Sequence, residues 1–286
     1  MQTPTCLPGP LGVTRAGWLC ETTGQPIPLH DCLECAEHRQ APACPFPPTM
    51  LKALANSMRG DDGLLEAQAL AQRAGVALLR VTSLLGCTRQ AWYILHGRPL
   101  LEKPSEHWSR LRGTIFHAAL ESLAGEHTVA ETRLIASLEE LGAHAWIAGK
   151  VDHYDPTLRL LTDYKSVNTF GRKMASLELP KQHHVAQLWI YGWLLGKFGY
   201  PYPLAARVVY MDMGAVRTVD VPMPDADMQA AVEARLVEKA RLITEANPDG
   251  PAGDPQEQWQ CSYCACAGQC PYRLKKHAPE ATAEGK

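Results

Sequence analysis

The sequence predicts an α/β fold with a central sheet flanked by helices. Apolar residues recur at helical spacing in residues 105–124, 179–198 and 224–246. Between these segments lie short runs rich in β-branched and aromatic residues and bounded by turn residues, which are typical of strands. The resulting order is helix, three strands, helix, two strands, helix. The strands are expected at 129–134, 149–155, 158–166, 204–211 and 216–221.

Composition excludes several classes of protein. A chain of 286 residues with 46% hydrophobic and 20% charged residues is ordinary for a globular protein, and it can bury one large core plus a small module. The net charge of −2 argues against binding nucleic acid by bulk charge, so any such contact must be local. No apolar run approaches the roughly 20 residues of a membrane span, and the first residues lack signal-peptide features. We expect a cytoplasmic protein with no membrane partner.

The first 48 residues are expected to form a cysteine-rich module that binds Zn²⁺. This region is rich in proline, glycine and cysteine and shows no long helical periodicity, so its small core needs a further crosslink. Cys32 and Cys35 have the spacing of a zinc knuckle, and Cys20 and Cys44 could complete a four-thiolate set. Rival ligands are His30, His38 and Cys6.

Residues 49–80 are expected to be a helical linker, with two helical segments broken at the glycines and aspartates of 60–63. A further helix is expected to end at Gly97, after caps at 81–83. It carries Cys87, which taken alone is a buried structural thiol because cysteine behaves as a small hydrophobe.

The helix at 105–124 places His117 and Glu121 on one face, because residues four apart are stacked along a helix. His117 could be a satisfied core residue or a metal ligand. Glu131, at the start of the next strand, is expected near the same site.

The hairpin at 149–166 is the candidate for chemistry. Asp152 and Asp163 could bring two carboxylates together across paired strands, and Lys165 shares a strand face with Asp163 because side chains alternate with period two. Carboxylate and carbonyl oxygens suit Mg²⁺ or Mn²⁺, which generate hydroxide for phosphodiester hydrolysis. An isolated Asp-x-Lys is more often a surface salt bridge, so its neighbours decide the interpretation.

On the helix at 179–198, Gln187 and Tyr191 lie four apart and present an amide and a phenol along one edge. These groups could bond a phosphate or support the strand of Lys165. The alternative is an aromatic helix packed in the core.

Near the C-terminus, Cys261, Cys264 and Cys270 supply three thiolates for a metal centre. The fourth could come from Cys266 or from Cys87. The spacing fits an iron-sulfur cluster or zinc and does not separate the two.

Taken together, these motifs resemble a known family. Their order is His117 in a Gly-x3-His helix, Gly149-x2-Asp152, Asp163-Tyr164-Lys165 and Gln187-x3-Tyr191. This order resembles the RecB-type exonucleases of the PD-(D/E)XK superfamily. With Cys87, Cys261, Cys264 and Cys270 it is similar to the iron-sulfur subset, which includes AddB-type helicase-nucleases and small CRISPR-associated exonucleases.

The resemblance implies a restriction-endonuclease-like mixed sheet and assigns roles to residues. His117, Asp152, Asp163 and the carbonyl of Tyr164 would bind Mg²⁺ or Mn²⁺, and Lys165 would act on the water. Gln187 and Tyr191 would hold DNA or the lysine. The four cysteines Cys87, Cys261, Cys264 and Cys270 would hold a structural 4Fe-4S cluster.

We therefore expect a nuclease domain at 81–272, followed by a flexible tail at 273–286. Its expected activity is metal-dependent exonucleolytic cleavage of single-stranded DNA ends, in CRISPR spacer acquisition or in recombination and repair, with an integrase or helicase as partner. The chain lacks a Gly-x4-Gly-Lys-Ser/Thr phosphate loop, so it does not unwind DNA by itself. A non-catalytic DNA-binding or assembly subunit and a redox protein are the alternatives.

Overall fold

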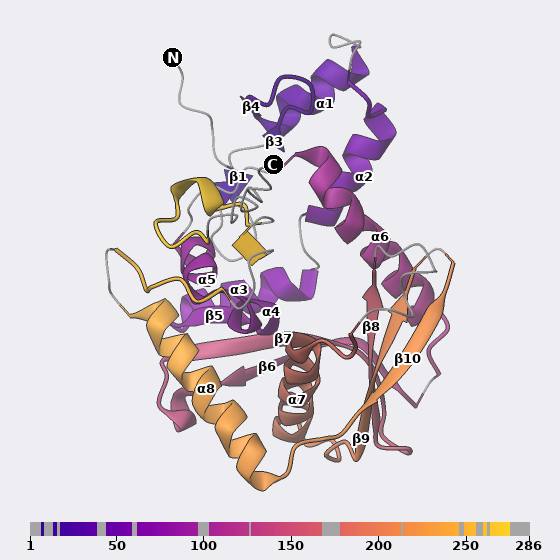
Figure 1. The fold of residues 1–286 in the computed structure, drawn as a ribbon, viewed down its shortest axis with the longest axis vertical. Helices are drawn as coiled ribbons and strands as arrows, with labels where there is room; N and C mark the ends of the chain where they lie inside the picture. The colour runs from indigo at the N-terminus through magenta and orange to yellow at the C-terminus, as the bar shows by residue number, and fades with distance from the viewer. Residues whose placement is uncertain are drawn as a thin grey trace, which may run out of the picture.

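A computed structural model shows a mixed α/β architecture (Figure 1). It describes residues 7–8, 14–15, 18–38, 44–58, 62–96, 103–125, 127–167, 178–212, 214–245, 249–255, 260–261 and 264–274. None of the helices in these ranges is both long and apolar enough to span a membrane.

The central feature of the described chain is a six-stranded mixed sheet in the order β10-β9-β8-β7-β5, with β6 also paired to β7. Only β5 with β7 and β8 with β9 are parallel, and the other pairs are antiparallel. The strands are β5 (Ala77–Arg80), β6 (Val129–Ser137), β7 (Ala145–Asp155), β8 (Leu160–Ser166), β9 (Ala205–Met211) and β10 (Val216–Val221). The predicted mixed sheet and the hairpin formed by β7 and β8 are confirmed.

Helices lie on the sheet and beside it. The three longest are α6 (Pro104–Glu121), α7 (Gln182–Lys197) and α8 (Ala226–Thr244), close to the predicted ranges. Helix α7 is buried around most of its circumference, and its Leu188, Leu194 and Leu195 are fully enclosed in the main core together with Ile147 and Val208 of the sheet. A helix that is apolar on nearly all sides belongs in the interior.

Two regions differ from the prediction. The single helix expected to end at Gly97 is divided into α4 (Val81–Leu85) and α5 (Thr88–Leu95). Gly86 and Cys87 between them are extended, and Lys239 of α8 donates a 2.7 Å hydrogen bond to the Gly86 carbonyl. A tertiary contact thus interrupts a locally continuous helical pattern.

The second difference is the predicted helical linker, 49–80. It contains α2 (Pro48–Met58) and α3 (Asp62–Arg73), but it ends in strand β5, which joins the central sheet beside β7. Only four residues form this strand, too few to show a period in the sequence. Leu78 and Leu79 of β5 are buried, and this burial adds the strand to the sheet.

The N-terminal part contains short elements. Strands β1 (Leu7–Pro8) and β2 (Thr14–Arg15) pair with each other, as do β3 (Trp18–Leu19) and β4 (Pro26–Ile27). They are followed by α1 (Leu29–Glu37), and α2 then packs along α6. Figure 1 shows β3, β4 and α1 beyond the end of α6 that is remote from the sheet.

Gly149 allows α7 to approach β7 closely. A Cβ atom at this position would lie 2.8 Å from Leu194 Cδ1 and from Tyr191 Cε1, and 3.0 Å from Val81 Cγ2. No side chain fits at these distances without displacing its neighbours. The glycine three residues before Asp152 therefore sets the distance between α7 and the strand that holds this carboxylate.

We expect Gly149→Ala to lower the free energy of unfolding by about 1–3 kcal/mol, because overpacking a filled core forces side chains off their rotamers. Gly196→Ala, on the facing helix α7, is the control. A Cβ there would make only an ordinary contact, 3.9 Å from Tyr202 Cδ2. Urea denaturation measures both changes, and equal stability of the two variants would contradict this account of the packing.

Candidate active site

The site forms where β7 and β8 part. Residues 145–148 of β7 pair with β5, and residues 153–155 pair with β8. Asp152 lies between these two pairings, and its Oδ2 atom accepts a 2.8 Å hydrogen bond from the backbone N–H of Tyr164 on β8. The Asp152 carboxylate therefore replaces the backbone carbonyl that would otherwise accept this hydrogen bond in the sheet. Asp152 and Asp163 lie where the two strands separate.

Asp163 and Lys165 lie on the same face of β8, as the period of two predicts. The Asp163 side chain is completely buried, and Lys165 Nζ lies 2.8 Å from each of its carboxylate oxygens. Burial opposes the charge on Lys165, but the Asp163 and Asp152 carboxylates outweigh it and raise the lysine pKa above its ordinary value. Lys165 is therefore an ammonium ion at neutral pH.

His117 reaches the same site from α6. Its Nδ1 atom lies 2.7 Å from Glu131 Oε1 and 3.5 Å from Asp152 Oδ1. Burial lowers the pKa of His117, but the hydrogen bond to Glu131 and the charge of Asp152 together raise it. One potential metal-ligand atom from each of His117, Glu131 and Asp152 lies within 4.8 Å of the other two. Among the described residues, no other three histidine, cysteine or acidic side chains are this close together.

Glu131 and Lys150 complete the site, and sequence analysis assigned a role to neither. Glu131 was expected only to lie near, and its left-handed φ of 47° marks strain in β6. Its second carboxylate oxygen lies 2.6 Å from Lys150 Nζ. A signal for Lys150 was present in the sequence, because residues two apart on a strand share a face and Lys150 is two residues before Asp152.

Burial makes the carboxylate of Asp152 costly to ionise. Burial is the main cause and the nearby Asp163 charge the second, and together they raise the pKa of Asp152 to about 7. A buried pair of carboxylates favours a bound cation, which offsets their repulsion. The buried Asp163 Oδ2 atom lies 2.8 Å from Lys165 Nζ, and a carboxylate oxygen keeps a further lone pair for a metal ion.

Gln187 and Tyr191, which were expected to hold DNA or the lysine, lie in the interior, and their role stays a prediction. Gln187 Nε2 donates a 2.8 Å hydrogen bond to the Tyr191 hydroxyl, and both side chains are buried. Burial raises the pKa of Tyr191, and the Asp152 and Asp163 charges add to this effect. The pair lies behind the two acids and is not exposed to a DNA strand in this conformation.

Tyr164 contributes its backbone N–H to Asp152, and its ring meets His117 edge-on at a centroid distance of 6.4 Å. The binding of a metal by its carbonyl stays a prediction.

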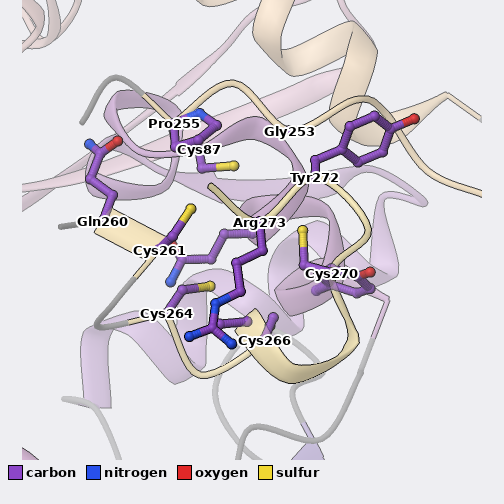
Figure 2. A pocket seen from close by; sticks show the side chains of 13 residues that line it. Cys87, Gly253, Pro255, Gln260, Cys261, Cys264, Cys266, Cys270, Tyr272 and Arg273 are labelled. Atoms are coloured by element: carbon purple, nitrogen blue, oxygen red, sulfur yellow. The ribbon is translucent and has the colours of Figure 1, made fainter. Parts of the chain in front are cut away.

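A second site lies near α5. Figure 2 shows the side chains of Cys87, Cys261, Cys264 and Cys270 around one pocket, which Tyr272 and Arg273 also line. Cys87 and the three C-terminal cysteines thus line one pocket, and their binding of a cluster stays a prediction. Cys266 also lines the pocket, but it is 1% exposed and packs against Trp92 and Tyr93.

A polar network holds Cys87 at this pocket. The Thr88 backbone N–H and hydroxyl donate to Asp254 at 2.5 and 2.7 Å, and Lys239 Nζ lies 3.2 Å from the same carboxylate. Burial raises the pKa of the Cys87 thiol, and the Asp254 charge adds to this effect. A thiol that resists ionisation becomes a thiolate readily only with a cation beside it.

Comparison with known proteins supports the predicted family. Residues 145–271 match the PD-(D/E)XK nuclease superfamily. The chain is 24% identical over 194 residues to the CRISPR-associated exonuclease Cas4 of Saccharolobus solfataricus. The aligned region covers 68% of this chain and 87% of that protein. The crystal structure of SSO0001 matches with a TM-score of 0.51 at 22% identity, covering 69% of this chain and 87% of that one. The resemblance of the motifs to the PD-(D/E)XK nucleases is confirmed, and the iron-sulfur cluster that it implies stays a prediction.

The raised pKa of Asp152 predicts a pH dependence of stability without divalent cations. The folded state binds this proton more tightly than the unfolded chain, so the free energy of unfolding falls as pH rises from about 4 to about 7. Asp152→Asn removes the buried charge and keeps an acceptor for the Tyr164 N–H.

We expect Asp152→Asn in EDTA at pH 8 to be more stable than the wild type by about 1 kcal/mol or more. Excess Mg²⁺ or Mn²⁺ should raise the melting temperature of the wild type and leave that of the variant unchanged. Thermal melts at pH 5 and pH 8 measure both effects. A variant that is less stable at pH 8 would show that Asp152 is structural.

Proposed function

We propose that this chain, in which residues 145–271 form a PD-(D/E)XK nuclease domain, is a divalent-metal-dependent exonuclease acting on single-stranded DNA ends. The observation that supports this most strongly is the cluster of Asp152, Asp163 and Lys165 beside His117. Two buried carboxylates cost stability unless they are compensated. In a domain with only a structural role, two buried carboxylates between separating strands would lower stability without a compensating function.

His117, Asp152, Asp163 and the backbone carbonyl of Tyr164 would hold one Mg²⁺ or Mn²⁺ ion. Imidazole and carboxylate donors fit such a cation, and ligand atoms of His117 and Asp152 lie within 4.8 Å of each other. When bound, the ion supplies a Lewis acid that lowers the pKa of a water molecule and neutralises phosphate charge.

The protein's own groups then divide the remaining work. Lys165, held as an ammonium against Asp163, donates to the attacking water or to the phosphorane oxygens and stabilises their negative charge. Its raised pKa favours this electrostatic role over that of a general base. Glu131 accepts from His117 Nδ1 and fixes the ring, which leaves the second ring nitrogen for a ligand.

The expected setting of this activity is CRISPR spacer acquisition, with an integrase as partner. Its support is the similarity to a protein named as a CRISPR-associated exonuclease. Action in recombination or repair beside a helicase is the alternative. The net charge of −2 fits local contact with a strand end better than coverage of long DNA.

Cys87, Cys261, Cys264 and Cys270 would hold a 4Fe-4S cluster. The four thiols come from two segments about 175 residues apart and line one pocket. Such a cluster would tie the segment between α4 and α5 to the chain that follows α8. Its role in this proposal is structural.

We expect Lys165→Gln to lower the rate of DNA cleavage about 100-fold or more, because the charge opposite the transition state is lost. Glutamine keeps a donor for the buried Asp163 carboxylate, so the fold should survive. Release of nucleotides from end-labelled linear and circular single-stranded DNA, with Mg²⁺ or Mn²⁺, measures activity and the need for an end.

Lys197→Ala is the matched control, because this lysine pairs with the exposed Glu140 and lies over the Trp193 ring, away from the buried acids, and should keep full activity. Cleavage by Lys165→Gln at the wild-type rate would refute the catalytic role of Lys165. Absence of cleavage by every form would favour a non-catalytic DNA-binding or assembly subunit.

The cluster predicts a brown protein with absorbance near about 400 nm after anaerobic purification. Cys87→Ser should lose iron and colour, whereas Cys266→Ser, at the neighbouring thiol that packs against Trp92, should keep both. Iron analysis and absorbance spectra give the result. Zinc in a colourless wild type, or loss of iron from Cys266→Ser alone, would contradict the assignment.

A further inference from the structure

Four cysteines of the N-terminal part surround one small core. Cys20 directly follows β3, Cys32 and Cys35 lie three residues apart on α1, and Cys44 precedes α2. Residues three apart on a helix are neighbours on its surface. Cys32 is buried in a core that also contains Trp18, Leu51 and Leu54.

One core brings the segments of these thiols together. Trp18, two residues before Cys20, belongs to the same core as Cys32, and Phe46, two residues after Cys44, packs against it. None of the four forms a disulfide. No three of their sulfur atoms lie within 4.8 Å of one another, so closing to zinc–sulfur distances of about 2.3 Å would draw them inward.

The elements around the thiols are too small to be stable alone. Strands β3 and β4 have two residues each, and α1 has nine. An isolated hairpin or a helix of this length is marginal in water, and modules of this size usually need a metal or a disulfide. Four thiols without a disulfide match the ligand set of a structural zinc site.

This module contacts the beginning of α6. Glu21, next to Cys20, accepts hydrogen bonds from the Ser105 hydroxyl at 2.8 Å and from the Ser105 backbone N–H at 3.2 Å. Ser105 lies in the first turn of α6, where backbone N–H groups lack helical partners and negative charge is favourable.

Two apolar contacts extend this docking. The Trp18 ring lies 6.4 Å from that of His107, and Leu111 of α6 packs against the core that contains Trp18. Helix α6 also carries His117, which lies twelve residues, or about 18 Å, beyond Ser105. A rigid helix transmits a displacement at one end to the other.

We propose that Cys20, Cys32, Cys35 and Cys44 bind one zinc ion, and that this ion holds Glu21 and Trp18 against α6 and thereby positions His117. The zinc site stands on the N-terminal residues alone. The consequence for His117 rests on the proposed nuclease function. The two parts are tested by different measurements.

Metal analysis of the full chain tests the zinc site. The wild type should contain one zinc per chain, and Cys35→Ser should lose at least 80% of it. His30→Ala removes a rival ligand that is exposed and pairs with Asp31, and it should keep the zinc. Cys87→Ser separates this site from the C-terminal thiols, because it should change iron and leave zinc unaltered. Absence of zinc from the wild type, or its retention by Cys35→Ser, would overturn the proposal.

Hydrogen exchange tests the docking without relying on nuclease activity. Glu21→Ala leaves the four thiols intact and should retain zinc, yet amides in the first turns of α6 should exchange at least 10-fold faster. Amides of β8 and β9 should be unaffected in this variant. Cys35→Ser should accelerate exchange in α6 in the same way. Unchanged α6 protection in Glu21→Ala would overturn the positioning role, even if zinc is present.

Discussion

The site depends on the parting of β7 and β8 at Asp152. A sheet normally satisfies backbone N–H groups with the carbonyls of the next strand. Here the N–H of Tyr164 donates to the Asp152 carboxylate, so an acidic side chain takes the place of a backbone carbonyl of the neighbouring strand. Asp163, the residue before Tyr164 on β8, is fully buried. Two acids are thereby held close together, and only a cation makes this arrangement favourable.

The surrounding structure offsets the cost of these charges. Lys165 neutralises one charge by pairing with Asp163. Helix α7 packs against β7 across Gly149, which holds the Gln187–Tyr191 pair behind the acids and excludes water from that side. The large apolar interface of α7 stabilises the fold enough to tolerate a strained and charged site, as functional sites commonly require.

Much of this arrangement could be predicted from the sequence, because it follows from local patterns. The period of two in β8 placed Asp163 and Lys165 together, and motif order linked His117 to them. The pairing of Glu131 with Lys150 depends on the register of β6 against β7, which no local pattern contains. Likewise, the break at Gly86 depends on a hydrogen bond from Lys239, a residue 153 positions away on α8. The burial of Gln187 and Tyr191 agrees with the alternative of an aromatic helix packed in the core, which the helical spacing alone could not distinguish from a polar edge facing a phosphate.

The acids at the parting of β7 and β8 are expected above all to hold a divalent cation. A crystal of the protein soaked in Mn²⁺ tests it directly through the anomalous signal of manganese. We predict a single strong peak bounded by His117, Asp152 and Asp163. A map without a peak between these side chains at saturating Mn²⁺, with the three residues ordered, would contradict the claim.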